Sequence, residues 1–251
     1  MKADEALFRF RYAAHAVVYT LAFAAPWEWR AGYDGSQTTW LTLAGWMTRN
    51  GWMSFRAATI GLLTIGTVCA WLGAWLRTWG TAYLGGAVVQ GPAMQGAGMV
   101  ADGPYRHLRN PLYLGTWVHT FALALLMPAS GAVFAIVAIG GLQVLLIRGE
   151  ERFLAAKLGE PYALYAARVP RLLPALRGAS DTALARGGAR ARWAQAVLAE
   201  IYMWGVAVSF AALGWQFNGR LLGRCVLVSL GVSLVVRGLV RRSGGDGAGG
   251  A

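Results

Sequence analysis

The sequence predicts an all-α fold, a polytopic membrane helix bundle with about six spans. Of its 251 residues, 57% are hydrophobic and only 14% are charged, whereas soluble domains average about 25% charged residues. Six apolar segments reach or approach the ~20 helical residues that are needed to cross about 30 Å of hydrocarbon. The chain also carries 12 tryptophans, a residue type enriched where membrane proteins meet the lipid interface.

The expected spans lie at residues 12–27, 57–76, 112–127, 129–147, 194–215 and 221–240. Pro128 separates the third from the fourth, so we expect these two spans to form a helical hairpin with a tight turn. Between the first two spans, several tryptophans are interpreted as interfacial anchors: Trp27, Trp29, Trp40, Trp46 and Trp52.

Basic residues are distributed unevenly among the connections. With the N-terminus placed in the cytoplasm, all but five of the 23 basic residues fall on the cytoplasmic side; the exceptions are Arg30, Arg49, Arg56, Arg220 and Arg224. Because cytoplasmic loops are enriched in Lys and Arg, we expect both termini to be cytoplasmic, in a membrane such as the bacterial inner membrane. The net charge of +12 then indicates contact with anionic lipid headgroups and not with nucleic acid.

The segment from Gly103 to Tyr113, GPYRHLRNPLY, stands at the start of the third span. Prolines fix φ and push the preceding residue out of the helical region, which predicts a shaped loop with Pro111 in the first turn of the next helix. Arginine forks suit carboxylate or phosphate groups, and tyrosines offer a ring face with a polar tip. The loop therefore has the side chains to hold a polar, charged small molecule at a membrane surface.

Two adjacent carboxylates, Glu150 and Glu151, follow the fourth expected span. Helix electrostatics favour cations at that end, so one interpretation is that a carboxylate points into a pocket shared with the Gly103–Tyr113 loop. The alternative is a solvated helix end flanked by Arg148 and Arg152. Further on, Gly159 and Pro161 interrupt the helical pattern, and Tyr162 and Tyr165 are expected on one face of the next short helix.

The order of these motifs, GPYRxxRNPxYxG, Glu150-Glu151, Gly159-x-x-Tyr162-x-x-Tyr165 and Val169-Pro170-Arg171, resembles the isoprenylcysteine carboxyl methyltransferase and phospholipid methyltransferase family of integral-membrane enzymes. The resemblance covers roughly residues 60–175, with Arg77-x-Trp79 as a weaker upstream part. We accordingly divide the chain into an N-terminal span with an outer loop (1–56), a methyltransferase-like core (57–175), a two-span extension (176–242) and a flexible tail (243–251).

The resemblance implies S-adenosylmethionine as the cofactor, held on the cytoplasmic side. Carried over residue by residue, its binding site comprises Gln90, Ala97, Gly98, Met99, Val100, Tyr105, Arg106, Asn110, Pro111, Leu112, Tyr113 and Glu150. Tyr105 or Tyr113 would pack on adenine, Glu150 would bind ribose hydroxyls or the ammonium, and Arg106 or Arg109 would pair with the methionyl carboxylate.

Candidate catalytic residues are Glu151, as a base for an amine or hydroxyl acceptor, together with Arg109 and Arg148. Asn110 stands where many family members have histidine, and Leu146 stands where eukaryotic members have a substrate-facing arginine. The second difference weakens the case for a prenylcysteine carboxylate as the substrate.

Single ionisable residues inside the spans receive a simpler interpretation. His15 and His119 stand alone, so no metal site is expected. Glu200 is either functional, as ionisable groups in spans tend to be, or paired with Arg192 near the interface.

The sequence thus predicts methyl transfer to a lipophilic acceptor, either the carboxylate of a prenylated thiol-type compound or a lipid amine or hydroxyl. Two alternatives remain open: an NADPH-dependent membrane reductase of related architecture, and a non-catalytic membrane protein that binds lipid or acts as a scaffold. Neither the acceptor nor the oligomeric state follows from the sequence.

Overall fold

The computed structural model describes residues 2–24, 37–94, 100–176, 178 and 190–245, with side chains described as far as residue 236. Every regular element within these ranges is helical, which confirms the predicted all-α class. In chain order they are α1 (Lys2–Arg9), α2 (Arg11–Ala24), α3 (Thr39–Arg49), α4 (Phe55–Leu84), α5 (Gly86–Gln90), the 3₁₀ turn η1 (Gly103–Arg106), α6 (Pro111–Ala124), α7 (Ala129–Leu158), α8 (Glu160–Arg168), α9 (Trp193–Ala199), α10 (Ile201–Leu213), the 3₁₀ turn η2 (Gly214–Gln216) and α11 (Gly219–Gly245).

Three of these helices are long and apolar enough to cross a membrane, namely α4, α7 and the Gly219–Val236 part of α11. A fourth span is formed if α9 and α10, which meet at a 75° bend, count as one broken helix. The six predicted spans are therefore not all confirmed. Helices α2 and α6 have 14 residues each, which gives roughly 21 Å at about 1.5 Å per residue, short of a full hydrocarbon core.

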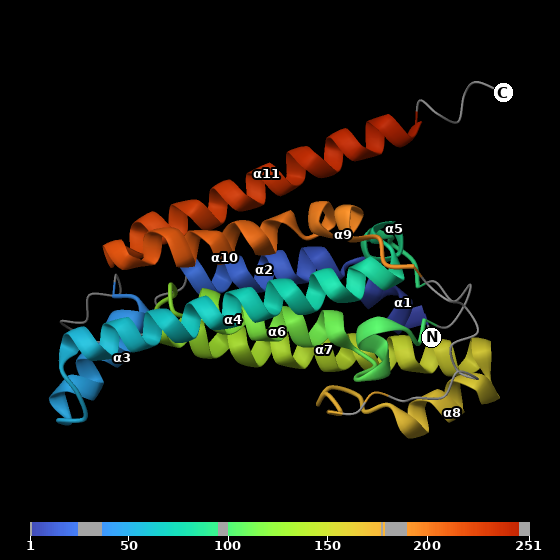
Figure 1. Cartoon of the computed structure of the whole chain (residues 1–251), viewed down its shortest axis with the longest axis horizontal. Coiled ribbons are helices and arrows are strands. Elements are labelled where there is room, and N and C mark those ends of the chain that lie inside the picture. The colour runs from blue at the N-terminus through green and yellow to red at the C-terminus, as the bar shows by residue number, and fades with distance from the viewer. Residues whose placement is uncertain (1, 25–36, 95–99, 177, 179–189, 246–251) are drawn as a thin grey trace.

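The long helices run side by side along the long axis of the molecule (Figure 1). Helices α1, α5 and α8 gather at one end together with the η1 loop, whereas α3 lies at the other end. Helix α4 is preceded by Ser54, whose hydroxyl accepts a hydrogen bond from Ala57 N, and is followed by Gly85 with a φ of 93°. It is the central element, because it contacts α3, α6, α9 and α10.

Helices α4 and α6 cross closely at two glycines. A Cβ on Gly73 would lie 2.7 Å from the carbonyl oxygen of Gly115, and a Cβ on Gly115 would lie 2.9 Å from the carbonyl oxygen of Gly73. Small residues at such a crossing let helix backbones approach each other in a membrane. The crossing brings Arg77 of α4 close to the first turns of α6, because Arg77 donates to Thr116 at 2.8 Å.

Helices α6 and α7 form the predicted hairpin, with Pro128 preceding the first turn of α7. Helix α7, however, continues to Leu158 and ends only where Gly159 adopts a φ of 59°. Glu150 and Glu151 consequently lie inside a continuous helix, not at its end as the sequence indicated. Tyr162 and Tyr165 follow in the short helix α8, as predicted, and both are buried.

The tryptophans between the first two predicted spans differ in burial. The segment after residue 36 forms the helix α3, which the sequence analysis did not predict. Trp40 was expected at the interface but is buried, and its indole donates to the carbonyl oxygen of Thr59 at 2.9 Å. Trp46 and Trp52 are exposed and contact each other edge to face, as interfacial anchors would. Trp27 and Trp29 lie outside the described residues.

The C-terminal extension packs on the core through α9 and α10. Two indoles fix α10 to α4: Trp71 donates to the carbonyl oxygen of Ala207, and Trp204 donates to the hydroxyl of Thr78. Helix α11 lies against α10 as the outermost layer (Figure 1). Many of its apolar side chains are exposed, including Leu227 and Leu234, as expected for a helix that faces lipid.

Candidate functional site

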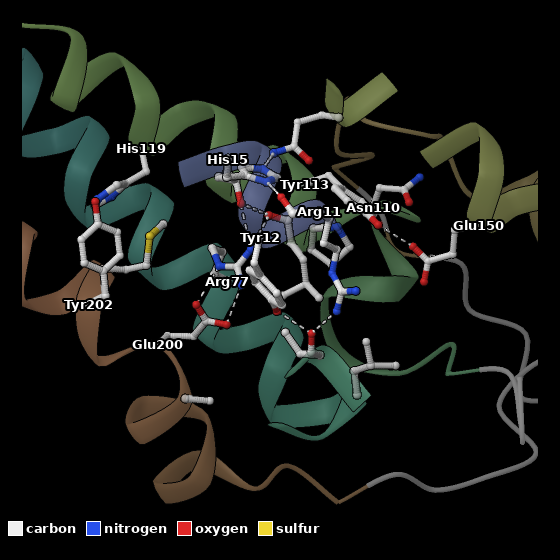
Figure 2. Close-up of a pocket in the computed structure, with 18 of the residues that line it drawn as sticks. Arg11, Tyr12, His15, Arg77, Asn110, Tyr113, His119, Glu150, Glu200 and Tyr202 are labelled. Carbon is white, nitrogen blue, oxygen red and sulfur yellow. Dashed lines mark hydrogen bonds and ion pairs between the residues drawn. The ribbon is translucent and has the colours of Figure 1, made fainter. Parts of the chain in front are cut away.

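A cavity of about 590 Å³ begins at the end of the bundle where α1, α5, α8 and the η1 loop gather. It continues between the helices, because residues of α2, α6, α10 and α11 also line it. The end near the loop is bordered by polar side chains from α6 and α7, and Figure 2 shows them converging on it. The far end is bordered by apolar residues such as Leu123 and Leu230. One space thus connects a polar surface loop with the apolar interior.

Glu150 of α7 and Tyr113 of α6 form the central polar pair at the loop end. The Tyr113 hydroxyl donates to Oε2 of Glu150 at 2.9 Å, and both residues line the cavity (Figure 2). Within the described part of the chain, this is the one hydrogen bond that the Glu150 carboxylate receives. A carboxylate offers about four acceptor positions, so Glu150 has capacity left for hydroxyl or amine donors of a ligand.

Three tyrosines form an aromatic wall beside this pair. Tyr105, Tyr162 and Tyr165 are buried and line the cavity, and the Tyr165 hydroxyl donates to the carbonyl oxygen of Tyr105 at 2.9 Å. Burial, reinforced by the negative charge of Glu150, holds the pKa of Tyr105 well above its usual value. Burial also raises the pKa of Tyr162 to about 12. Both side chains therefore remain neutral at physiological pH.

Glu151 also lines the cavity, but its two oxygens are already bonded. Oε1 accepts from Arg109 and from Asn110, each at 3.1 Å, and Oε2 accepts from Arg171 at 2.8 Å. The hydrogen bond to Glu151 raises the pKa of Arg171. These contacts join the loop before α6, helix α7 and the segment after α8. They indicate that Glu151 holds the Gly103–Tyr113 loop against α7. Its role as a base stays a prediction.

The remaining predicted residues divide into three groups. Val100, Asn110, Pro111 and Leu112 line the cavity, as does the Glu151-bound Arg109. Gln90, Arg106 and Arg148 are not among the described residues that line it. Arg106 turns outward to an ion pair with Asp102 at 3.7 Å, and Arg148 is exposed on α7. Ala97, Gly98 and Met99 lie outside the described residues.

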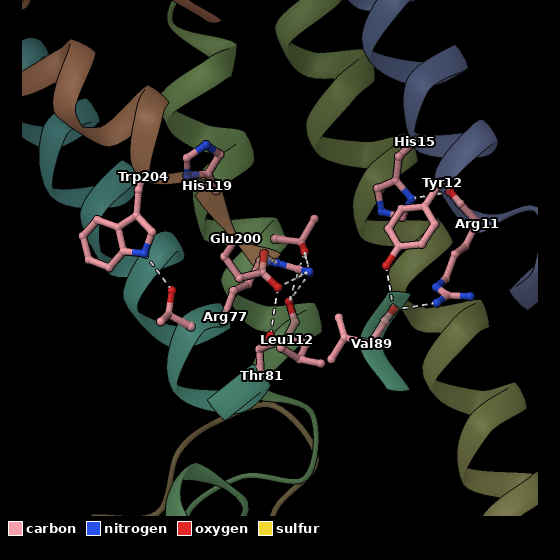
Figure 3. Close-up of polar contacts among 12 residues, drawn as sticks. Arg11, Tyr12, His15, Arg77, Thr81, Val89, Leu112, His119, Glu200 and Trp204 are labelled. Atoms are coloured by element: carbon pink, nitrogen blue, oxygen red, sulfur yellow. Dashed lines mark hydrogen bonds and ion pairs between the residues drawn. The ribbon is translucent and has the colours of Figure 1, made fainter. Parts of the chain in front are cut away.

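Arg11, at the start of α2, is a site residue that the sequence reasoning missed. It is 6% exposed and lines the cavity, and its guanidinium donates to the carbonyl oxygens of Phe8, Val89 and Gly91. Figure 3 shows the contact with Val89. Among the described residues it has no carboxylate partner, so a positive charge stands at the cavity wall. The sequence feature that could have identified it is an arginine at the start of an otherwise apolar segment. We had interpreted this arginine only as one of the basic residues that orient the chain in the membrane.

A buried ion pair lies deeper in the cavity, where Arg77 of α4 meets Glu200 at the bend between α9 and α10 (Figure 3). Arg77 binds both carboxylate oxygens, at 2.7 Å and 2.9 Å, and the hydroxyl of Thr81 donates to the same carboxylate at 2.8 Å. Both charged residues line the cavity. The partner of Glu200 is therefore Arg77 and not Arg192, the partner that the sequence had suggested.

One comparison with known proteins gives a match. Residues 62–160 match the family model described as phospholipid methyltransferase, which confirms the resemblance recognised from the motifs. The matched segment contains α6, α7, most of α4, and the Tyr113–Glu150 pair. Searches of curated proteins and of solved structures give no significant match. The matched family and the membrane-length helices together support an integral membrane protein. Over residues 62–160 the chain is thus similar to the phospholipid methyltransferase family, and this similarity supports a membrane methyltransferase that acts on lipid-type substrates.

Proposed function

We propose that this protein transfers a methyl group from S-adenosylmethionine to a lipophilic acceptor that reaches the site from the bilayer. The observation that carries the proposal is the shape of the cavity. It joins the Tyr113–Glu150 pair beside the polar loop to an apolar interior bordered by α11. A polar nucleoside and a lipid chain can occupy the two ends of such a space at the same time.

The side chains at the loop end suit S-adenosylmethionine. Glu150 has acceptor positions left for ribose hydroxyls, and Tyr105 and Tyr162 supply ring faces for a purine. Arg11 takes the place that the sequence had given to Arg106 or Arg109, because its buried guanidinium has no described carboxylate partner and can pair with the methionyl carboxylate. When bound, the cofactor supplies a sulfonium methyl group that is already electrophilic.

The chain's own task is then to orient the reactants and exclude water. Glu151 contributes as a positioning residue, because its bonds to Arg109, Asn110 and Arg171 hold the loop against α7 and α8. The neutral, buried tyrosines close the loop end. We place this end on the cytoplasmic side, in keeping with the positions of the basic residues.

The acceptor would enter between α2 and α11. Phe23 and Thr20 of α2 line the cavity, and so do Leu227 and Leu230 of α11. The two leucines are also 68% and 45% exposed, so this part of the cavity wall is in contact with the surroundings. In a membrane those surroundings are lipid, and a lipid tail can remain in the bilayer while its polar end enters the cavity.

Ligand-dependent stability of the detergent-solubilised full chain tests the proposal. A ligand that binds only the folded state stabilises it by about 2.7 kcal/mol at roughly a hundredfold excess over Kd. S-adenosylhomocysteine should raise the melting temperature, whereas NADPH should not. Glu150→Gln should weaken the effect, and Glu160→Gln, an exposed carboxylate at the same end of the bundle, should leave it unchanged. Stabilisation by NADPH alone would favour the reductase.

A further inference from the structure

The loop end of the cavity is bordered on one side by the N-terminal helices. Phe8 of α1 lines the cavity, and so do Arg11 and Tyr12 of α2. All three residues precede the segment that matches the family model, residues 62–160. Helix α1 lies at the same end of the bundle as α5 and α8 (Figure 1). The chain therefore encloses its site in part with helices that this match does not include.

The start of α2 is firmly held by two side chains. Arg11 donates to the carbonyl oxygens of Val89 and Gly91, each at 2.8 Å. The Tyr12 hydroxyl donates to the carbonyl oxygen of Val89 at 2.6 Å, and Figure 3 shows Arg11 and Tyr12 reaching Val89 together. Because Arg11 is almost fully buried, moving α2 away from α5 would leave a buried charge without its hydrogen bonds, which is costly.

The wall formed by the loop before α6 is also fixed. The backbone N–H of Arg109 donates to the carbonyl oxygen of Pro170 at 2.9 Å, and the N–H of Ala175 donates to that of His107 at 2.9 Å. The hydrogen bonds to Glu151 described above act between the same segments. The loop before α6 is thus held against the segment after α8 by both backbone and side-chain bonds.

Helix α1 is fastened more weakly than these two walls. Phe8 is its only buried side chain among those described. An ion pair joins α1 to α7, with Arg152 donating to Asp4 at 2.9 Å, but the Arg152 side chain is 67% exposed. Exposed ion pairs add little stability, and a helix of eight residues is marginal by itself. Segments with so few buried contacts open locally at low free-energy cost.

The junction between α1 and α2 joins the movable helix to the cofactor site. Phe10 belongs to neither helix, so the chain has a break there about which α1 can turn. Just before the break, the carbonyl oxygen of Phe8 accepts a hydrogen bond from Arg11 at 2.7 Å. The Arg11 guanidinium carbon also lies 3.8 Å from the centre of the Phe8 ring. Phe8 thus covers the guanidinium, and a charge pair shielded from water in this way is stronger than an exposed one.

We propose that α1 is a lid that opens to admit and release S-adenosylmethionine, and that the Asp4–Arg152 ion pair holds it closed. This inference rests on the proposed function and adds a control over cofactor exchange. In the closed position Phe8 covers Arg11 and the carboxylate bound to it. In the open position α1 turns about Phe10 while α2 stays bonded to α5. The two reactants then use separate entrances, because the acceptor enters between α2 and α11.

A disulfide between α1 and α7 tests whether the lid must move. A Cβ on Gly149 would lie 3.1 Å from the Cβ of Asp4. Disulfides join Cβ atoms about 3.5–4.5 Å apart, so a small shift of α1 lets cysteines at both positions bond. The full-length variant Asp4→Cys/Gly149→Cys in detergent would be loaded with radiolabelled S-adenosylhomocysteine, oxidised with copper phenanthroline, and diluted into unlabelled ligand.

We expect the cross-link to slow the loss of label about tenfold or more, because lid opening limits release. Dithiothreitol should restore the faster rate. The single variants Asp4→Cys and Gly149→Cys, treated with the same oxidant, are the matched controls and should show no slowing. They also control for the native cysteines Cys69 and Cys225, which are free.

The ion pair provides a second test that needs no cross-link. Arg152→Gln should speed the dissociation of S-adenosylhomocysteine about two- to fivefold, the range expected for the loss of one exposed ion pair. Higher ionic strength should speed dissociation from the wild-type protein and not from Arg152→Gln, because salt screens exposed charges. Glu5→Gln removes an exposed carboxylate from the same helix and should leave the rate unchanged.

The outcomes separate the lid from the proposed function. If the wild-type protein does not bind S-adenosylhomocysteine, the proposed function is wrong and the lid has no cofactor to hold. If it binds, but the cross-linked variant releases label as fast as its reduced form, α1 is a fixed wall; the lid is then wrong and the proposed function stands. If the cysteine variant does not fold, the dissociation rates decide the matter, and equal rates for Arg152→Gln and Glu5→Gln would overturn the lid.

Discussion

Replacing Glu200 with alanine should destabilise the protein more than any other single change to a polar side chain in the bundle. Glu200 receives three hydrogen bonds, two from Arg77 and one from Thr81. The side chains of Glu200 and Arg77 are only 4% and 16% exposed. Without its partner, Arg77 remains as a buried charge, and breaking such a pair costs about 3–5 kcal/mol.

A double-mutant cycle isolates the pair from the packing of either residue. Arg77→Met should be costly as well, because it leaves the Glu200 carboxylate unpaired. The double variant Arg77→Met/Glu200→Ala should recover much of the loss, because replacing both charges of a buried pair by apolar groups is often close to neutral.

Reversible unfolding in mixed micelles with increasing SDS measures the free energy of unfolding of all four proteins. Additive losses in the double variant would show that Arg77 and Glu200 do not depend on each other. A Glu200→Ala variant as stable as the wild type, within about 0.5 kcal/mol, would refute the account of this ion pair.

Three further predictions concern the crossing, the tyrosine wall and the clamp. Gly73→Ala should destabilise the protein by about 1–3 kcal/mol, because the added Cβ would lie 2.7 Å from the carbonyl oxygen of Gly115. The control is Gly61→Ala on the open face of α4, which should leave the stability unchanged. Equal stability of the two variants would contradict the close crossing of α4 and α6. Because burial raises the pKa of Tyr162 from 10.0 to about 12, the free energy of unfolding should be unaffected by this group below pH 10.0. It should fall as the pH rises from 10.0 toward about 12. Tyr162→Phe should therefore flatten the fall in unfolding free energy across this window, and an unchanged slope would contradict the burial. Glu151→Gln should increase trypsin cleavage in the Gly103–Tyr113 loop while methyl transfer persists, because Glu151 holds this loop through Arg109 and Asn110. Unchanged cleavage with complete loss of methyl transfer would instead identify Glu151 as the catalytic base.

The sequence predicted the helical class and the motif-bearing loop well, because local chemistry determines both. Pro111 and the preceding residues specify a loop followed by a helix start, and the structure has this arrangement. The end of α7 was placed too early. Polar residues after residue 147 had suggested a helix terminus, but α7 continues to Leu158. Within it, Gly149 lies beside Asp4 of α1, and Glu151 is bonded to the loop before α6.

Long-range partners were beyond what one sequence can show. Arg77 and Glu200 are 123 residues apart, and only the packing of α9 and α10 against α4 brings them together. Arg11 was counted as a topological charge, although its contacts with Val89 and Gly91 place it at the cavity. Arg106 was assigned to the cofactor on motif position alone, but the η1 turn directs it outward to Asp102.

The most direct test of the central claim is methyl transfer itself. The full-length protein in lipid nanodiscs would be incubated with radiolabelled S-adenosylmethionine and a total lipid extract, and label would then be counted in the organic phase. We predict label in the lipid fraction with the wild-type protein and with Glu160→Gln, and a loss of about ten- to a hundredfold with Glu150→Gln, because that variant weakens hydrogen bonds to a charged group. No label in lipid, while S-adenosylhomocysteine still binds, would contradict a lipid acceptor. Equal labelling by Glu150→Gln and the wild-type protein would contradict the site.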